Sequence, residues 1–237
     1  MKIFVIKFYF YGSKKVVPIN YNDKLLSFLH TKILGKDNPY HDSISLYSIS
    51  PLFNSKTTKS GLIFENGAIW NIRTPSIDVF KDIYLKAKNA ISEEFGYGLV
   101  LKNVEYSVED IDVNGELVVG CSPVYLGQNK QSDKPDHITY KHGNEMSSAI
   151  MKRNFQSKAK SLGYDINEND FNIEFVDDDT IKTKCITIGT IPNITTSGKI
   201  KITGNSDVIG LCYGFGVGIS TGCGFGYLYN FNMKKNG

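Results

Sequence analysis

The sequence predicts an α+β fold made of two tandem ferredoxin-like (βαββαβ) domains, residues 1–115 and 116–237, with a C-terminal glycine-rich loop. Along residues 1–113, segments with strand character alternate with two segments of helical spacing in the order β-α-β-β-α-β. The rest of the chain follows the order β-α-β-β-x-β, in which x is a run rich in glycine. The two halves share no sequence repeat, so the order of their elements alone carries this prediction.

The elements of the first half each have a local signature. β-Branched and aromatic residues predict a strand over 3–11, and a stripe of leucine and isoleucine predicts a helix over 20–35, with Asn22 or Asp23 as N-cap and Gly35 as its end. Alternation predicts a short strand over 43–50, and Asn66-Gly67 predicts a hairpin. Ser76 begins a second helix over 76–96, and a strand follows over 99–113.

The second half is less regular. We expect a strand over 116–127 and a helix over 144–163 whose inner side carries Met146, Ile150, Phe155 and Leu162. Further strands are predicted over 171–176, 181–189 and 198–204, and "GYLYNFNM" predicts the last one. The glycine-rich run fills the place of this half's second helix, and we expect it to be a non-helical turn.

Composition limits the function classes. With a net charge of +3 and a sequence pI of about 8.5, the chain permits a polyanionic partner without requiring one. Arg73 and Arg153 are the only arginines, so bidentate reading of guanine is scarce. The 4 cysteines form no CxxC pair and lie at no zinc-ligand spacing to histidine, which favours free thiols in the cytoplasm and predicts no metal and no cofactor. Lys7 interrupts the apolar N-terminus, which argues against a signal peptide.

The stretch from Val208 to Tyr229 carries no charge and many glycines. A membrane helix is disfavoured, because each glycine costs a helix about 1 kcal/mol relative to alanine. A dinucleotide or P-loop motif is disfavoured too, because the third glycine of GxGxxG and the Gly-Lys-Ser/Thr sequence are missing. Two readings remain: a loop that packs closely against its own core, or one whose backbone amides approach a phosphate-bearing partner.

The histidines offer chemistry that needs no metal. RNA can be cut when its own 2′-hydroxyl attacks the phosphorus, provided that the protein supplies a base, an acid and positive charge. His30 lies on the first predicted helix and His41 in the loop that follows, so the two could converge on one pocket. His137 and His142 flank a polar loop, where we expect surface residues or RNA contacts.

The segment "GVGISTGCGFG" resembles the C-terminal glycine-rich loop of RAMP-superfamily proteins, a Gly-x-Gly followed about five residues later by Gly-Phe-Gly. Gly216, Gly218, Gly224, Phe225 and Gly226 match this pattern directly. Within that superfamily the whole chain resembles the CRISPR-associated endoribonucleases of the Cas6 family. The length, the two ferredoxin-like halves, the "SPVYL" turn and the histidine pair fit this resemblance.

The resemblance implies a metal-independent endoribonuclease that processes CRISPR repeat RNA (pre-crRNA) into guide RNAs by 2′-hydroxyl attack, leaving 2′,3′-cyclic phosphate and 5′-hydroxyl ends. It implies His30 and His41 as catalytic residues. Some members carry a lysine after the loop histidine, which this chain lacks, so Lys36 or Tyr47 is a candidate third group. The alternative is a non-catalytic RAMP-type subunit that holds guide RNA in a CRISPR effector complex.

The partner implied by the resemblance is repeat RNA, and other effector subunits or a homodimer remain open, with no membrane. Expected RNA contacts come from the glycine-rich loop: Gly216, Gly218, Gly222, Gly224, Phe225 and Gly226. Basic residues are the second expected source, with a solvated face as the alternative: Lys152, Arg153, Lys158, Lys199 and Lys201.

Overall fold

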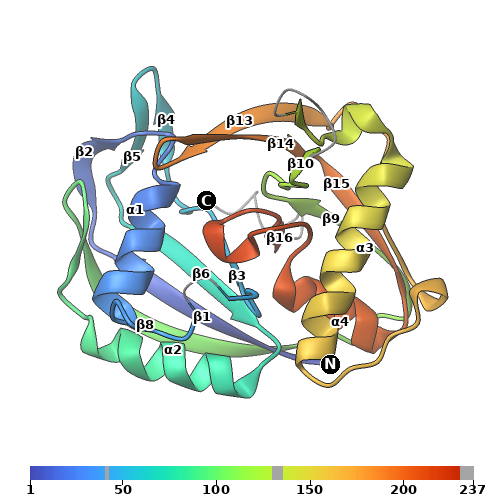
Figure 1. The fold of residues 1–237 in the computed structure, drawn as a ribbon. Coiled ribbons are helices and arrows are strands. Elements are labelled where there is room, and N and C mark those ends of the chain that lie inside the picture. Colours follow the sequence, from blue (N-terminus) through green and yellow to red (C-terminus); the bar gives the residue numbers. More distant parts are fainter. Residues whose placement is uncertain (41–42, 130–135, 230–237) are drawn as a thin grey trace.

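The computed structural model describes residues 1–40, 43–129 and 136–229, and it contains two main antiparallel sheets (Figure 1). The first sheet has the strand order β3-β6-β1-β8-β7. Its strands are β1 (Lys2–Phe10), β3 (Ser48–Ile49), β6 (Ala68–Thr74), β7 (Glu94–Gly96) and β8 (Leu99–Asp110). The helical segments of this half are α1 (Asn22–Ser27), its π-helical continuation η1 (Phe28–Ile33) and α2 (Ile77–Asn89). The order is that of a ferredoxin-like unit, with β7 added at one edge.

The second sheet has the strand order β12-β15-β9-β16, which is again ferredoxin-like. Its strands are β9 (Gly115–Cys121), β12 (Asn172–Phe175), β15 (Lys199–Gly204) and β16 (Leu228–Tyr229). The two helices of this half are α3 (Asn144–Ser161) and α4 (Ser206–Phe215). The predicted tandem ferredoxin-like fold is therefore confirmed, with a helix where the sequence suggested none.

Smaller elements are inserted between the main strands. One three-stranded sheet consists of β2 (Ser13–Val17), β5 (Gly61–Phe64) and β4 (Lys56–Thr58), and a long hairpin consists of β13 (Lys182–Ile188) and β14 (Ile191–Ser197). This hairpin arches across the top of the molecule towards the first half in Figure 1. The remaining pieces are β10 (Gln128–Asn129), β11 (Asp136–His137) and three short 3-10 turns, η2 (Tyr140–His142), η3 (Glu168–Asp170) and η4 (Thr221–Cys223).

Each sheet has its own apolar core. Ile6, Phe8 and Trp70 are completely buried between the first sheet and its helices, whereas Met151, Ile200 and Ile202 occupy the same position in the second half. Leu46 packs against both cores, so the segment before β3 lies at the junction between the halves.

Several local predictions hold and others fail. The Ser76 hydroxyl accepts the amide of Val79 at 3.3 Å, as expected of an N-cap, and Gly35 ends the first helical segment with φ +84°. The hairpin predicted at Asn66-Gly67 is only a turn, because β5 and β6 on either side of it join different sheets. Asn22 does not cap its helix; its amide donates instead to the carbonyl of Cys223, 3.2 Å away in the other half.

Helix α4 corrects the expected non-helical turn. Its N-cap is Asn205, whose side chain accepts the amide of Val208 at 2.9 Å. Two glycines sit where the helix meets the first half: a Cβ at Gly210 would lie 2.5 Å from the Met1 side chain, and one at Gly214 would lie 2.8 Å from Pro75. Close approach to the first half therefore explains these glycines. Helix α3 brings a second correction, because Met146, which we expected on the inner side of this helix, is exposed.

Candidate functional site

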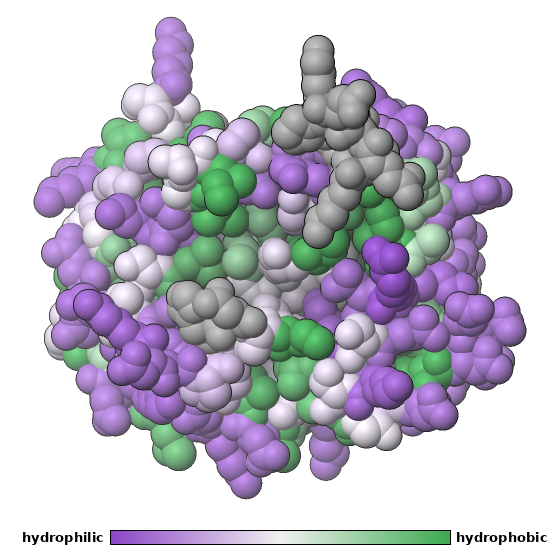
Figure 2. Space-filling model, in the orientation of Figure 1, coloured by the Kyte–Doolittle hydropathy of each residue, from purple (hydrophilic) through white to green (hydrophobic). Residues whose placement is uncertain are grey.

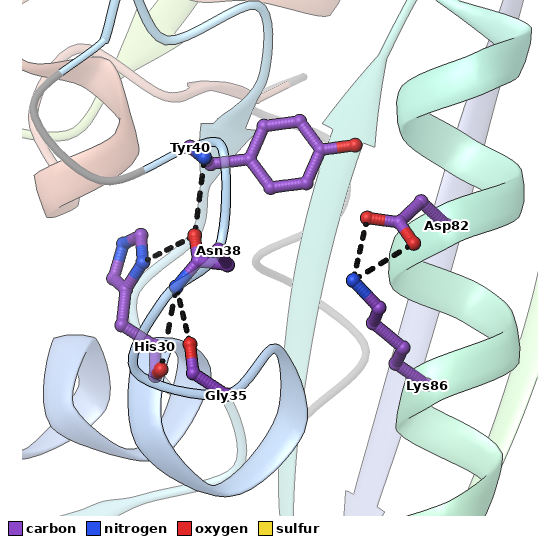
Figure 3. A network of polar contacts seen from close by, with 6 residues as sticks. All are labelled: His30, Gly35, Asn38, Tyr40, Asp82 and Lys86. Atoms are coloured by element: carbon purple, nitrogen blue, oxygen red, sulfur yellow. Dashed lines mark hydrogen bonds and ion pairs between the residues drawn. The ribbon is translucent and has the colours of Figure 1, made fainter.

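His30 lies in the π-helical segment η1, in which the amide of Leu34 donates to the carbonyl of Leu29 at 2.9 Å. The apolar side of this segment is buried in the first core, whereas His30 is only half-buried on its polar side. Widened π-helical turns are rare and occur frequently at functional sites. We call residues 28–40, which run from this segment to Tyr40, the histidine corner (Figure 3).

Asn38 is the centre of the histidine corner, and it is buried. Its amide nitrogen donates to the carbonyl of Gly35 at 2.6 Å and to that of His30 at 3.4 Å. Its amide oxygen accepts the backbone N–H of Tyr40 at 3.1 Å and lies 3.3 Å from Nδ1 of His30. Figure 3 shows all four contacts converging on this one side chain. Asn38 thus closes the loop back onto the helical segment and contacts the imidazole directly.

Tyr40 follows Asn38 in the loop, and its side chain does not point at His30. Figure 3 shows its ring extending away from His30 towards α2, where Asp82 and Lys86 form an ion pair with an N–O distance of 2.9 Å. Burial, followed by the charge of Asp82, raises the pKa of Tyr40 to about 12. Tyr40 therefore keeps its proton at neutral pH. Tyr40 was not a candidate from the sequence, because tyrosine in a polar loop carries no distinctive pattern.

The remaining predicted catalytic residues have different positions. His41 lies outside the described residues, so its role stays a prediction. Lys36 is exposed in the loop after Gly35 and remains a candidate third group. Tyr47 is buried, its ring meets that of Tyr40 edge-on, and burial raises its pKa far above the ordinary value. This burial argues against Tyr47 as a group that touches RNA, and we correct that expectation.

Residues 216–226, the glycine-rich loop, are mostly buried between the two halves. Gly216, Gly218, Gly224 and Gly226 have positive φ, and a Cβ at Gly226 would lie 1.8 Å from the carbonyl oxygen of Val217. Phe225 is buried as well. Positive φ and close neighbours, both within the loop and outside it, account for these glycines, so the structure favours the core-packing reading.

Several amides of this loop already have partners. The N–H groups of Gly216, Gly224 and Gly226 donate to the carbonyls of Cys212, Thr221 and Pro123 at 2.9, 3.2 and 2.9 Å. Because these three amides already have partners within the protein, they do not support the reading in which the loop's amides approach a phosphate. Gly224 remains only half-buried, so RNA contact by the loop stays a prediction that concerns its outer edge.

The outer edge of the loop borders a cleft of about 170 Å³ between the halves. The walls of this cleft are mainly apolar and come from both halves, with Ile19 and Leu62 on one side and Ile186 of the β13–β14 hairpin on the other. Figure 2 shows apolar side chains gathered at the middle of this face and hydrophilic ones around its rim. Asn22 and Gly224 also line the cleft.

Lys158 corrects one of the expected RNA contacts. It is buried beneath the glycine-rich loop, where its Nζ donates to the hydroxyl of Thr221 at 2.8 Å, and that hydroxyl donates to the carbonyl of Tyr47 at 3.0 Å. Burial lowers the pKa of Lys158 to about 7. Its side chain therefore joins α3, the loop and the first half, and cannot reach a phosphate at the surface.

The other basic candidates differ in their surroundings. Lys199 is paired with Asp178 at 2.8 Å and Lys201 with Glu174 at 2.5 Å, so acidic partners already offset both charges. Arg153 is exposed, and Lys152 is half-buried with its Nζ 5.1 Å from the centre of the Phe171 ring. Both line a groove beside α3 that also contains Glu145, Glu168 and Glu174. Arg153 is thus the strongest of these candidates for contact with a polyanion.

Arg73 joins the two halves. It is buried, with its guanidinium 3.7 Å from the ring centre of Tyr213 and 4.5 Å from that of Tyr227. It donates to the carbonyl of Leu228 at 2.8 Å. The arginine comes from β6 of the first sheet and its partners from α4 and the end of the second half, so it fixes the halves to each other.

The two histidines of the second half make local contacts within the protein. His142 closes a capping turn in which its Nδ1 accepts the amide of Thr139 at 3.1 Å, and the ring of His137 lies 6.2 Å from that of Tyr125.

Within residues 1–40, 43–129 and 136–229, no group of three or more His, Cys, Asp or Glu side chains could hold a metal ion. Over the same residues, no helix has the length and apolar character needed to cross a membrane.

Comparison with known families decides the relationship. A family profile described as CRISPR associated protein Cas6, C-terminal, matches residues 107–229, more than half of the chain. The chain belongs to the Cas6 family. This makes it a CRISPR-associated RAMP protein and connects it with the binding and processing of CRISPR repeat RNA. No curated protein sequence matches the chain.

Solved structures share the fold over almost the whole chain. A structure described as a RAMP protein binding different RNA substrates has 16% sequence identity and a TM-score of 0.78, covering 96% of this chain and 98% of its own. A CRISPR associated protein Cas6 has 18% identity and a TM-score of 0.77, covering 96% and 99%. A Cas6-related protein from Pyrococcus furiosus has 17% identity and a TM-score of 0.77, covering 97% of each chain. At these identities the likeness establishes the fold alone.

Proposed function

We propose that this protein is a metal-independent endoribonuclease that cuts CRISPR repeat RNA into guide RNAs in the cytoplasm. The observation that carries the proposal is a histidine, His30, held by Asn38 at a half-buried corner of a chain that belongs to the Cas6 family. The solved structure of a RAMP protein that binds different RNA substrates, which has the same fold, adds support for RNA as the partner. We assign the chemistry to the first domain, residues 1–115.

The proposed reaction is an internal transesterification. His30 takes the proton of the 2′-hydroxyl, whose oxygen then attacks the adjacent phosphorus. The bond from phosphorus to the 5′-oxygen breaks, and His41 gives a proton to that leaving oxygen. The products are a 2′,3′-cyclic phosphate and a 5′-hydroxyl, and Lys36 is the candidate for stabilising the negative charge on the phosphate.

Single-turnover cleavage of cognate repeat RNA in excess EDTA tests the proposal. We expect cutting to proceed in EDTA and to leave cyclic-phosphate ends. An otherwise identical RNA with a 2′-deoxy nucleotide before the scissile phosphate should bind normally and remain uncut, because it lacks the nucleophile. Cleavage that requires added Mg²⁺ or Mn²⁺ would refute the histidine mechanism. Tight binding without cleavage of either RNA would favour a non-catalytic subunit that holds guide RNA.

A further inference from the structure

The side chain of Asn38 has a fixed orientation, which the surrounding backbone imposes. Two carbonyl groups, those of Gly35 and His30, face one end of its amide, and only the NH₂ group can donate to them. The backbone N–H of Tyr40 faces the other end, which must therefore be the oxygen. Exchanging the oxygen and nitrogen of this amide would set like groups against each other at all three contacts.

This orientation determines the proton position on the neutral His30 ring. The Asn38 oxygen, which can only accept, lies 3.3 Å from Nδ1. Nδ1 must then carry the hydrogen, and in a neutral imidazole the other nitrogen, Nε2, carries the lone pair. We propose that Asn38 is a positioning residue that holds His30 protonated at Nδ1, so that Nε2 accepts the proton of the RNA 2′-hydroxyl.

The consequence for the reaction depends on the proposed function. When Nε2 takes up the proton, the ring becomes an imidazolium whose Nδ1–H still points at the Asn38 oxygen. The contact therefore stabilises the charged ring and fixes which nitrogen faces the substrate. Because the amide is neutral, it does so without adding a negative charge next to the RNA phosphate.

Three variants separate positioning from support of the loop. Asn38→Ala removes every contact of the side chain. Asn38→Asp keeps an acceptor for His30 and Tyr40 but loses the donor to the two carbonyls, so both variants should lower the melting temperature. Thr31→Ala is the matched control, since Thr31 lies in the same π-helical segment and its hydroxyl donates to the carbonyl of Ser27 instead of contacting the ring.

Nitrogen NMR of ¹⁵N-histidine-labelled free protein, with His30→Ala for assignment, measures the tautomer and the pKa of His30 without RNA. We expect the Nδ1–H tautomer in the wild type and in Thr31→Ala, and a shift towards Nε2–H in Asn38→Ala. The pKa of His30 should fall in Asn38→Ala and rise in Asn38→Asp, because the first loses an acceptor and the second gains a carboxylate.

The other charged groups around the corner stay constant in these variants. Among the described residues they are the pair Lys32–Glu93, with an N–O distance of 2.8 Å, the exposed Lys36 and Asp37, and on α2 the side chains Asp78, Asp82 and Lys86. Opposite pKa changes in the two Asn38 variants, at similar loss of thermal stability, would therefore report on the contact between Asn38 and His30.

Cleavage by the same variants completes the test. The low-pH limb of the single-turnover rate profile should move to lower pH in Asn38→Ala and to higher pH in Asn38→Asp. An Nε2–H tautomer in the wild type, or pKa changes of the same sign, would overturn the inference while leaving the cleavage proposal intact. If the wild type binds repeat RNA and does not cut it, the base role falls with the proposed function, and the tautomer is still decided by NMR.

Discussion

The histidine corner and the glycine-rich loop are both marked by the sequence, and they are built in opposite ways. The corner has a polar, half-exposed side, and one buried amide, that of Asn38, holds His30 and the following loop together there. The loop is mostly buried, and the amides of Gly216, Gly224 and Gly226 donate to carbonyls of the protein. The buried Lys158 donates to the hydroxyl of Thr221 in this loop. Under the proposed function, the corner carries the chemistry and the loop fixes the two halves that frame it.

The largest expected effect is at the histidine corner. Replacing His30 or His41 by alanine should slow single-turnover cleavage by roughly 10²–10⁴-fold, the usual contribution of a positioned proton-transfer group. RNA affinity should change little, because RNA is held by contacts elsewhere. Thermal stability should change little in the His30 variant, because that ring is only half-buried. His142→Ala is the control and should cut at nearly the wild-type rate. A wild-type rate in the His41 variant would remove that residue from the site.

The glycine-rich loop should respond in stability instead. Gly226→Ala places a Cβ 1.8 Å from the Val217 carbonyl at a φ of +61°, whereas Gly189→Ala has nearly the same φ, +59°, and no neighbour within 4 Å. The control should lose about 1–2 kcal/mol from its backbone conformation alone. Gly226→Ala should lose about 1–3 kcal/mol more through overpacking.

Denaturant unfolding of the two glycine variants measures this difference, and cleavage per folded molecule should remain normal in both. Equal stability losses would show that the loop is not packed as described. A Gly226→Ala protein of normal stability that no longer cuts would place the chemistry in the loop and undo the comparison.

The lysine beneath the loop should make stability depend on pH. Its pKa is about 7 in the folded protein against an ordinary value of 10.5, so the folded state loses this proton first as the pH rises. Between these values the unfolded chain binds more protons, and stability therefore rises with pH by up to about 1.4 kcal/mol per pH unit. Lys158→Met should abolish this part of the slope between pH 7.5 and 10. An unchanged slope in the variant would mean that Lys158 is charged or exposed.

The smallest expected effect concerns RNA binding by Arg153, which is exposed on α3. Arg153→Ala should weaken RNA binding modestly and reduce the slope of log affinity against log salt by about 0.7, the value for one phosphate contact on a single strand. Lys201→Ala is the matched control, because Glu174 already pairs with this lysine at 2.5 Å. Equal effects of the two substitutions would show that ion pairing on the protein surface does not select the RNA contacts.

The fold could be predicted because the hydrophobic period and the ends of each helix and strand depend on neighbouring residues, and the order of these elements follows from them. The Ser76 cap, the Gly35 stop and the βαββαβ order of the first half all follow from neighbouring residues. Helix α4 was missed because glycine disfavours helices, and only its contact with Met1 and Pro75 explains why glycine stands there. Its cap, Asn205, was the available signal.

The site was less accessible to sequence reasoning. His30 was a candidate from its residue type and place, but Asn38 gains its role only when the loop closes back on the π-helical turn. Tyr47 and Lys158 looked like usable polar groups, and burial between the halves removes both from the surface. Such burial depends on contacts between residues far apart in the chain, which no local pattern records.

The central claim is tested most directly by the double variant His30→Ala, His41→Ala, with binding and single-turnover cleavage of repeat RNA measured on the same preparation in EDTA. The account predicts wild-type affinity and melting temperature together with a loss of cleavage of at least about 10²-fold, smaller than the product of the two single losses because the pair acts as a unit. Cleavage at the wild-type rate by this stable, RNA-binding double variant would contradict the account.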